Sequence, residues 1–134
     1  MMTSEQLQKH WMESAEEDLD VMETLYKNKK YPQSLFYGHL VIEKLLKALF
    51  AKVNAESPIA PRIHNLEKLA ALSKIELDQA TFSSLSLITN FNMAARYDSN
   101  KRDFKELCTP KFTMEQIKEI RGLREWIYQK LITK

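Results

Sequence analysis

Residues 35–53 restrict the fold of this chain more than any other segment, because nearly every position in them is apolar. Successive residues of a helix lie about 100° apart around its axis, and on that spacing the apolar side chains cover most of the circumference. The tightest stripe consists of Leu35, Ile42, Leu46, Leu49 and Val53. A helix that is apolar on nearly all sides is buried among other helices. The sequence therefore predicts an all-α fold with this helix at its centre.

One narrow polar sector interrupts the central helix. It holds His39, Glu43, Lys44 and Lys47. Charged side chains are almost never buried without a partner, so we expect this sector to reach water, a neighbouring subunit or a ligand, as part of a cleft or an interface. His39 lies one turn before Glu43, where a hydrogen bond between the two can fix one imidazole tautomer for acid–base chemistry. A structural histidine at the rim of a helix interface, satisfied by Glu43, is the alternative.

Apolar residues recur with helical spacing in four further segments. Together with the central one, the predicted helices span residues 4–28, 32–53, 66–72, 78–96 and 113 to the C-terminus. We expect Asp78 to cap the fourth helix, Thr113 and Gln116 to form a capping box on the last, and His64 to be a cap or packing residue. Residues 97–112 lack clear periodicity and are expected to form a long polar loop. With 134 residues, the chain fits a single domain, residues 1–134.

Composition and cysteine content argue against several classes of protein. The net charge of +2 is too mild to identify a nucleic-acid-binding protein by itself. The single cysteine, Cys108, cannot form an intrachain disulfide, and the N-terminus lacks the pattern of a signal peptide, so we expect a cytoplasmic location. Charged residues interrupt the longest apolar region, so we expect no membrane span. The three histidines lack zinc-type spacing, and we expect no metal and no cofactor.

A basic cluster follows the end of the fourth predicted helix. It consists of Arg96, Tyr97, Asn100, Lys101 and Arg102. Positive charge, an aromatic ring that can stack on a base and amide donors are what a nucleotide or single-stranded RNA site needs. These five residues are the candidate nucleotide- or RNA-binding site. An arginine that stabilises a helix C-terminus, followed by a solvated basic loop, explains the same residues equally well.

The order of short motifs along residues 11–97 resembles the HEPN family, named for higher eukaryotes and prokaryotes nucleotide-binding. The matching motifs are Trp11 with Ala15 and Asp18-Leu19, then Glu43-Lys44-x-x-Lys47-Ala48, His64-Asn65-Leu66 and Arg96-Tyr97. The resemblance implies an up-and-down bundle of four to five helices, often a homodimer with a polar cleft between its subunits. It also implies a nucleotidyltransferase partner in a toxin–antitoxin-like module.

Members of the family that cleave RNA carry an arginine followed, after a few polar residues, by a histidine. In these members the histidine transfers protons and the arginine stabilises phosphate charge. Arg96 matches the arginine, but no histidine occurs after His64. The resemblance therefore favours a nucleotide- or RNA-binding protein over an enzyme. One alternative is a metal-independent endoribonuclease that uses Arg96 with a displaced proton carrier such as His39, and another is a protein-interaction module without nucleotide binding.

Overall fold

A computed structural model describes residues 2–96 and 98–133, but not the side chains of residues 93–100. Within this part of the chain it contains helices and no strand, which confirms the all-α prediction. The helices are α1 (Ser4–Lys27), α2 (Tyr31–Val53), α3 (Leu66–Leu72), α4 (Gln79–Arg96), α5 (Asp98–Leu107) and α6 (Pro110–Ile132). The expected four to five helices fall short of the six that these residues form.

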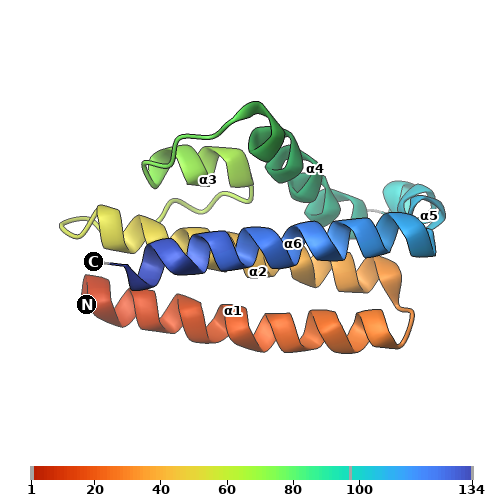
Figure 1. Ribbon diagram of the computed structural model, residues 1–134, viewed down its shortest axis with the longest axis horizontal. Coiled ribbons are helices and arrows are strands. Elements are labelled where there is room, and N and C mark those ends of the chain that lie inside the picture. The colour runs from red at the N-terminus through yellow and green to blue at the C-terminus, as the bar shows by residue number, and fades with distance from the viewer. Residues whose placement is uncertain (1, 97, 134) are drawn as a thin grey trace.

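Helix α2 lies at the centre of the bundle, and each of the other helices packs against it. Figure 1 shows α1, α2 and α6 running side by side along the long axis, with α3 and α4 across α2 from α1. Helix α5 lies at the end of the bundle where α1 turns into α2, and the two chain termini lie at the opposite end (Figure 1). This arrangement confirms that the apolar segment is the central helix.

The core of the bundle is built on α2. Its buried residues are Ser34, Leu35, Gly38, His39, Val41, Ile42, Glu43, Leu45, Leu46, Ala48, Leu49 and Ala51. Gly38 packs tightly against α6 and α1, because a Cβ atom there would be 2.5 Å from Ile120 Cδ1 and 3.2 Å from Met22 Sδ. A Cβ at this position would therefore force the ends of the Ile120 and Met22 side chains to shift.

Side-chain caps mark where several helices begin. Asn65 accepts a hydrogen bond from the backbone N–H of Lys68 at the start of α3. Asp78 Oδ1 accepts one from the N–H of Thr81 at 2.7 Å, which confirms the predicted cap of α4. These bonds satisfy backbone donors that have no partner within the first turn of a helix.

The predicted loop over residues 97–112 is wrong, because residues 98–107 form α5 and α6 begins at Pro110. Phe104 is buried and anchors α5, with its ring centroid 5.5 Å from that of Phe91 on α4. Thr109 caps α6, and Pro110 suits the first turn because its missing N–H is not needed there. Thr113 is therefore not a cap. It lies inside α6, where its side chain is fully buried.

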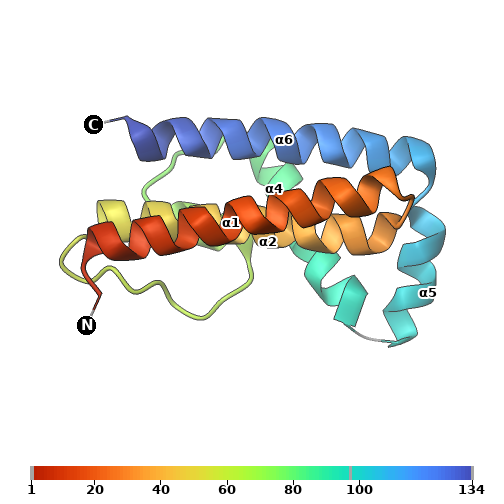
Figure 2. The same ribbon diagram turned by 90° about the horizontal axis from the view of Figure 1, so that it is seen from below.

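The segment between α2 and α3, residues 54–65, runs back alongside α2 instead of leaving the bundle (Figure 2). It brings His64 next to the middle of α2, where the ring of His64 bonds to Glu43 and its carbonyl to His39. Among the helices of the described residues, none combines the length and the apolar character needed to cross a bilayer.

Candidate functional site

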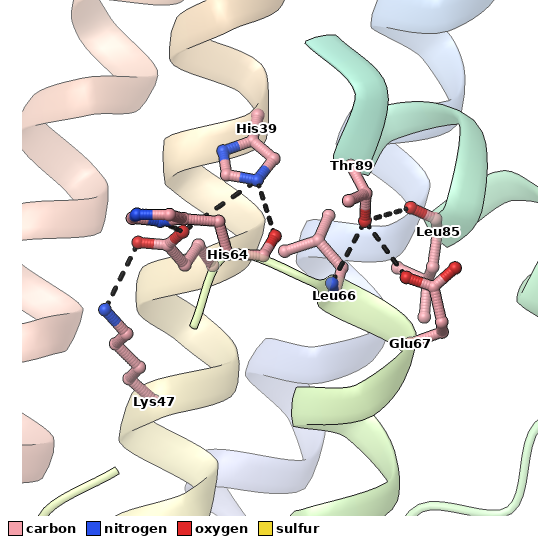
Figure 3. A network of polar contacts seen from close by, with 8 residues as sticks. His39, Lys47, His64, Leu66, Glu67, Leu85 and Thr89 are labelled. Carbon is pink, nitrogen blue, oxygen red and sulfur yellow. Dashed lines mark hydrogen bonds and ion pairs between the residues drawn. The ribbon is translucent and has the colours of Figure 1, made fainter. Parts of the chain in front are cut away.

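The polar sector of α2 meets the end of the 54–65 segment beside α3. Figure 3 shows His39 and Lys47 on α2, with His64 reaching toward them from the segment that leads into α3. The imidazole rings of His39 and His64 lie 6.4 Å apart between centroids. The fold thus places a second histidine, which is distant in sequence, against the predicted polar sector.

Glu43 is the centre of this polar network. Its Oε1 accepts a hydrogen bond from His64 Nδ1 at 2.7 Å, and its Oε2 accepts one from Lys47 Nζ at 3.2 Å. The residue is buried, with 4% of its surface exposed. A buried carboxylate is costly unless both of its oxygens find hydrogen-bond donors, and here both do.

His39 is fully enclosed beneath His64. Its Nε2 lies 3.0 Å from the backbone carbonyl of His64, and because a carbonyl only accepts, Nε2 carries the proton of the neutral ring. Its Nδ1 is buried and has no hydrogen-bond partner among the described residues. Burial lowers the pKa of His39, against the raising effects of the bond to His64 and of the Glu43 charge. His39 is therefore a buried neutral group.

The predicted hydrogen bond between His39 and Glu43 is wrong. His39 Nε2 lies 3.8 Å from Glu43 Oε1, beyond hydrogen-bond distance, and both groups bond to His64 instead. The expectation that the polar sector reaches water or another molecule fails for these two residues, since their own chain covers them. Whether the sector belongs to a cleft or an interface stays a prediction.

The two lysines of the sector form ion pairs, Lys44 with a residue of α1 and Lys47 with a residue of α2. Lys44 Nζ lies 2.6 Å from Asp18 Oδ2, and the two side chains are 21% and 13% exposed. Lys47 Nζ, besides its bond to Glu43, lies 5.1 Å from the centroid of the Trp11 ring. The motif residues that the sequence spreads over α1, α2 and the 54–65 segment are thus brought together in the fold.

His64 is the residue that sequence reasoning misassigned. Asn65, not His64, caps α3, and the imidazole of His64 bonds to Glu43 with its side chain 53% exposed. Because a carboxylate only accepts, Nδ1 carries the proton of the neutral ring and Nε2 keeps a lone pair. The pairing joins residues 21 positions apart, so no helical spacing could reveal it. The one indication of this pairing in the sequence is that His64 and Glu43 both lie in motifs shared with the HEPN family.

Thr89 fixes the chain just after His64. Its Oγ1 accepts a hydrogen bond from the backbone N–H of Leu66 at 3.0 Å. Its hydroxyl proton has two acceptors in reach, the carbonyl of Leu85 at 2.9 Å and Glu67 Oε1 at 3.1 Å (Figure 3). Helix α4 therefore holds the start of α3, and with it the position of residue 64.

The basic cluster lies on α4 and α5. Lys101 and Arg102 are exposed on α5, within one turn of Phe104, which packs α5 against the last part of α4. Arg96, where α4 ends, and Asn100 have side chains outside the described part, and Tyr97 lies outside it altogether. The backbones of Asn100, Lys101 and Arg102 thus lie on α5, and that of Arg96 lies on α4. The role of all five residues in binding stays a prediction.

Two further features bear on ligands. A hollow of about 410 Å³ lies between the ends of α2 and α6 and the segment that follows α3. Lys52 on its wall already donates to the carbonyls of Lys130, Leu131 and Thr133. Over the residues that the structure describes, no group of three or more His, Cys, Asp and Glu side chains could hold a metal ion.

Comparison with protein families gives one match. The model of the HEPN domain family matches residues 8–131, which is nearly the whole chain and includes both the polar network on α2 and the basic cluster. Comparison with curated proteins and with solved structures found no significant match.

Proposed function

The chain belongs to the HEPN domain family, and on this premise we propose that it binds a nucleotide or RNA and acts with a nucleotidyltransferase partner in a toxin–antitoxin-like module. The observation that carries the binding proposal is the pair of exposed cations, Lys101 and Arg102, on the anchored helix α5. Phosphate groups contribute most of the affinity when proteins bind nucleic acids, and lysine and arginine are the side chains that neutralise them.

The position of α5 supports this proposal. The contact of Phe104 with Phe91 holds α5 against α4, so the two cations are presented by a packed helix instead of a free loop. Less conformational freedom is then lost when a ligand binds. In the proposed site Arg96 joins the two cations in neutralising phosphate, Tyr97 stacks on a base, and Asn100 donates from its amide.

A homodimer is part of the same proposal, following the family resemblance. Lys44 and Lys47, which are partly exposed, would line the cleft between subunits together with His64. The oligomeric state can be measured by light scattering, and a monomer at all concentrations would remove this part of the proposal. The partner part fails if no nucleotidyltransferase gene lies beside the gene for this chain, or if the two purified proteins do not bind each other.

The binding test is a fluorescence-anisotropy titration of a labelled mixed-sequence RNA and of labelled ATP at low salt. The variant K101Q/R102Q removes the two cations, and K9Q/K68Q, which alters exposed lysines on α1 and α3, changes the net charge equally. We expect the first variant to bind at least about tenfold more weakly than the second, because a hydrogen bond to a charged group contributes about 1.5–3 kcal/mol. Equal weakening by both variants would contradict the proposed site. If the wild type binds neither probe, the protein-interaction module remains as the candidate function.

A metal-independent endoribonuclease is the second candidate function, and the partly exposed His64 is the observation that favours it. His39, the proton carrier suggested by the sequence, has no exposed surface. The test is cleavage of a mixed RNA pool in chelator by the wild type and by Arg96→Ala prepared identically. Cleavage that Arg96→Ala abolishes would establish the enzyme, whereas no cleavage by either protein would leave a binding domain.

A further inference from the structure

Helix α4 has an unusual sequence for a helix at a protein surface. Charged residues make up 28% of the chain, yet residues 79–95 contain no Asp, Glu, Lys or Arg. The solvent-facing side of a surface helix typically carries charged and polar residues. On α4 this side is a stripe of uncharged residues that are exposed or half-buried and lie three or four positions apart. The stripe, called here the outer face of α4, consists of Phe82, Ser83, Ser86, Leu87 and Asn90.

The outer face of α4 exposes two large apolar side chains. Phe82 is 45% exposed and Leu87 is 36% exposed. The central part of a protein interface differs from ordinary protein surface by its lack of charged residues and its larger share of aromatic ones. The outer face of α4 has both properties, so its composition is that of an interface between proteins.

The rest of α4 is fixed within the bundle, on the side of α2 away from α1 (Figure 1). Its buried side consists of Leu85, Ile88 and Phe91. Thr89 Oγ1 accepts a hydrogen bond from the N–H of Leu66 on α3 at 3.0 Å, and Ser84 Oγ donates one to Glu119 Oε1 on α6 at 2.8 Å. The outer face is the side that these contacts leave exposed. Because α4 is already held in place, little conformational freedom is lost when this face meets a partner.

The chemistry of the outer face suits pairing with an identical face. Two copies related by a twofold axis bring the same surface patch together. The hydroxyl groups of Ser83 and Ser86 and the amide of Asn90 can each donate and accept hydrogen bonds, so they can bond to the same kinds of group on a second copy. A face that carries charge of one sign cannot pair with itself in this way, because like charges repel.

The outer faces of the other long helices are less suited to such pairing. The middle of α1 exposes acidic residues, among them Glu17 and Asp20. A twofold axis through that face would bring like charges together. Helix α6 exposes charges of both signs, among them Glu115 and Lys118. Their burial in an interface would be costly unless each found a partner.

We infer that two copies of this chain pair through the outer face of α4, with Phe82 and Leu87 buried in the contact. This inference rests on the homodimer in the proposed function, and it names the surface that the two subunits share. Removal of the two apolar side chains from water drives the pairing, and the hydroxyl and amide groups align the two helices. Because no charge takes part in the contact, the pairing should depend little on salt.

The experiment places charges on the outer face and measures the molar mass by light scattering over a range of protein concentrations, without RNA. The variant S83K/L87K adds two lysines to the outer face. The matched control V21K/T24K makes the same change at an exposed apolar and an exposed hydroxyl residue of α1. We expect a dimer for the wild type and for the control. The dissociation constant of S83K/L87K should be at least about a hundredfold higher, because its four added lysines meet across the twofold axis.

A charge-swap measurement keeps the test independent of misfolding. The variant S83E/L87E should also be a monomer alone. An equal mixture of S83K/L87K and S83E/L87E should form a dimer with one copy of each, which native mass spectrometry identifies by its mass. Opposite charges meet in this mixed dimer. A variant that had lost its fold could not recover the dimer in this way.

The outcomes separate this inference from the proposed function. If S83K/L87K forms as tight a dimer as the wild type, or if the mixture forms no mixed dimer, α4 is not the shared surface, and the homodimer and RNA binding still stand. A wild-type dimer that dissociates as the salt concentration rises would also contradict an uncharged contact.

A wild type that is a monomer at all concentrations would overturn this inference together with the homodimer, and would leave RNA binding standing. If S83K/L87K, but not V21K/T24K, then failed to bind the nucleotidyltransferase partner, the outer face of α4 would belong to that partner.

Discussion

Acidification should destabilise this fold through His39. The ring is fully buried, its Nδ1 has no partner among the described residues, and its Nε2 already donates to the carbonyl of His64. Desolvation lowers the pKa of His39, the bond to His64 and the charge of Glu43 oppose this, and His64 and Lys47 add to the lowering. A second proton, on Nδ1 of His39, would therefore be buried without a hydrogen-bond acceptor.

The sign and the size of the effect follow from proton linkage. An unfolded histidine binds its proton near pH 6.5, whereas folded His39 binds it only at lower pH, so acid favours the unfolded chain. The stability due to the neutral ring is fully present above the unfolded pKa and is lost as the pH falls through it toward the folded pKa. Between about pH 7.5 and 5.5 the loss is at most about 1.4 kcal/mol, the free energy that protonation gives an unfolded histidine over that range.

The assay is urea unfolding followed by far-UV circular dichroism at both pH values, for wild type, His39→Gln and His10→Gln. The glutamine at position 39 cannot titrate, so this variant should lose up to about 1.4 kcal/mol less stability on acidification than the wild type. His10→Gln should follow the wild type. If the wild type and His39→Gln lose the same stability, His39 does not carry a lowered pKa and the reasoning is refuted.

Three other changes test the packing. Gly38→Ala should be about 1–3 kcal/mol less stable in urea than Gly122→Ala. A Cβ at residue 38 would lie 2.5 Å from a side-chain atom of α6, whereas a Cβ at residue 122 would have nothing within 4 Å. Equal stabilities of the two variants would contradict this close approach. Burial raises the pKa of Cys108 to about 11, so the folded thiol should react with Ellman's reagent at pH 8 at least about a hundredfold more slowly than in denaturing urea. Phe104→Ala should cost about 3–5 kcal/mol of stability and also weaken RNA binding, whereas unchanged stability would mean that its buried contact with Phe91 does not anchor α5.

The course of the backbone was largely predictable because local patterns determine it. The apolar periodicity of residues 35–53 identified the central helix, and Asp78 marked the start of α4. Helix α5 was missed because Phe104 and Leu107 are the only apolar residues among positions 98–107, too few to show a period. What holds α5 is the contact of Phe104 with Phe91, which depends on the tertiary fold.

The candidate site was predictable only in part, for a related physical reason. Sequence spacing placed His39 and Glu43 on one face of α2, and that face is indeed polar. The two residues do not bond to each other because the 54–65 segment folds back and offers His64, whose ring bonds to Glu43 and whose carbonyl bonds to His39 Nε2. Two residues that are 21 positions apart show no periodic pattern that would reveal their contact. The only link between them in the sequence was that both lie in motifs shared with the HEPN family.

The most direct test of the proposed function is the salt dependence of RNA binding. Each phosphate neutralised on a single strand contributes about 0.7 to the slope of log affinity against log salt. If Lys101 and Arg102 each neutralise one phosphate, the slope for K101Q/R102Q should be shallower than that of the wild type by about 1.4. The slope for K9Q/K68Q should match the wild type. Equal slopes for all three proteins would show that α5 does not bind phosphate and would contradict the account.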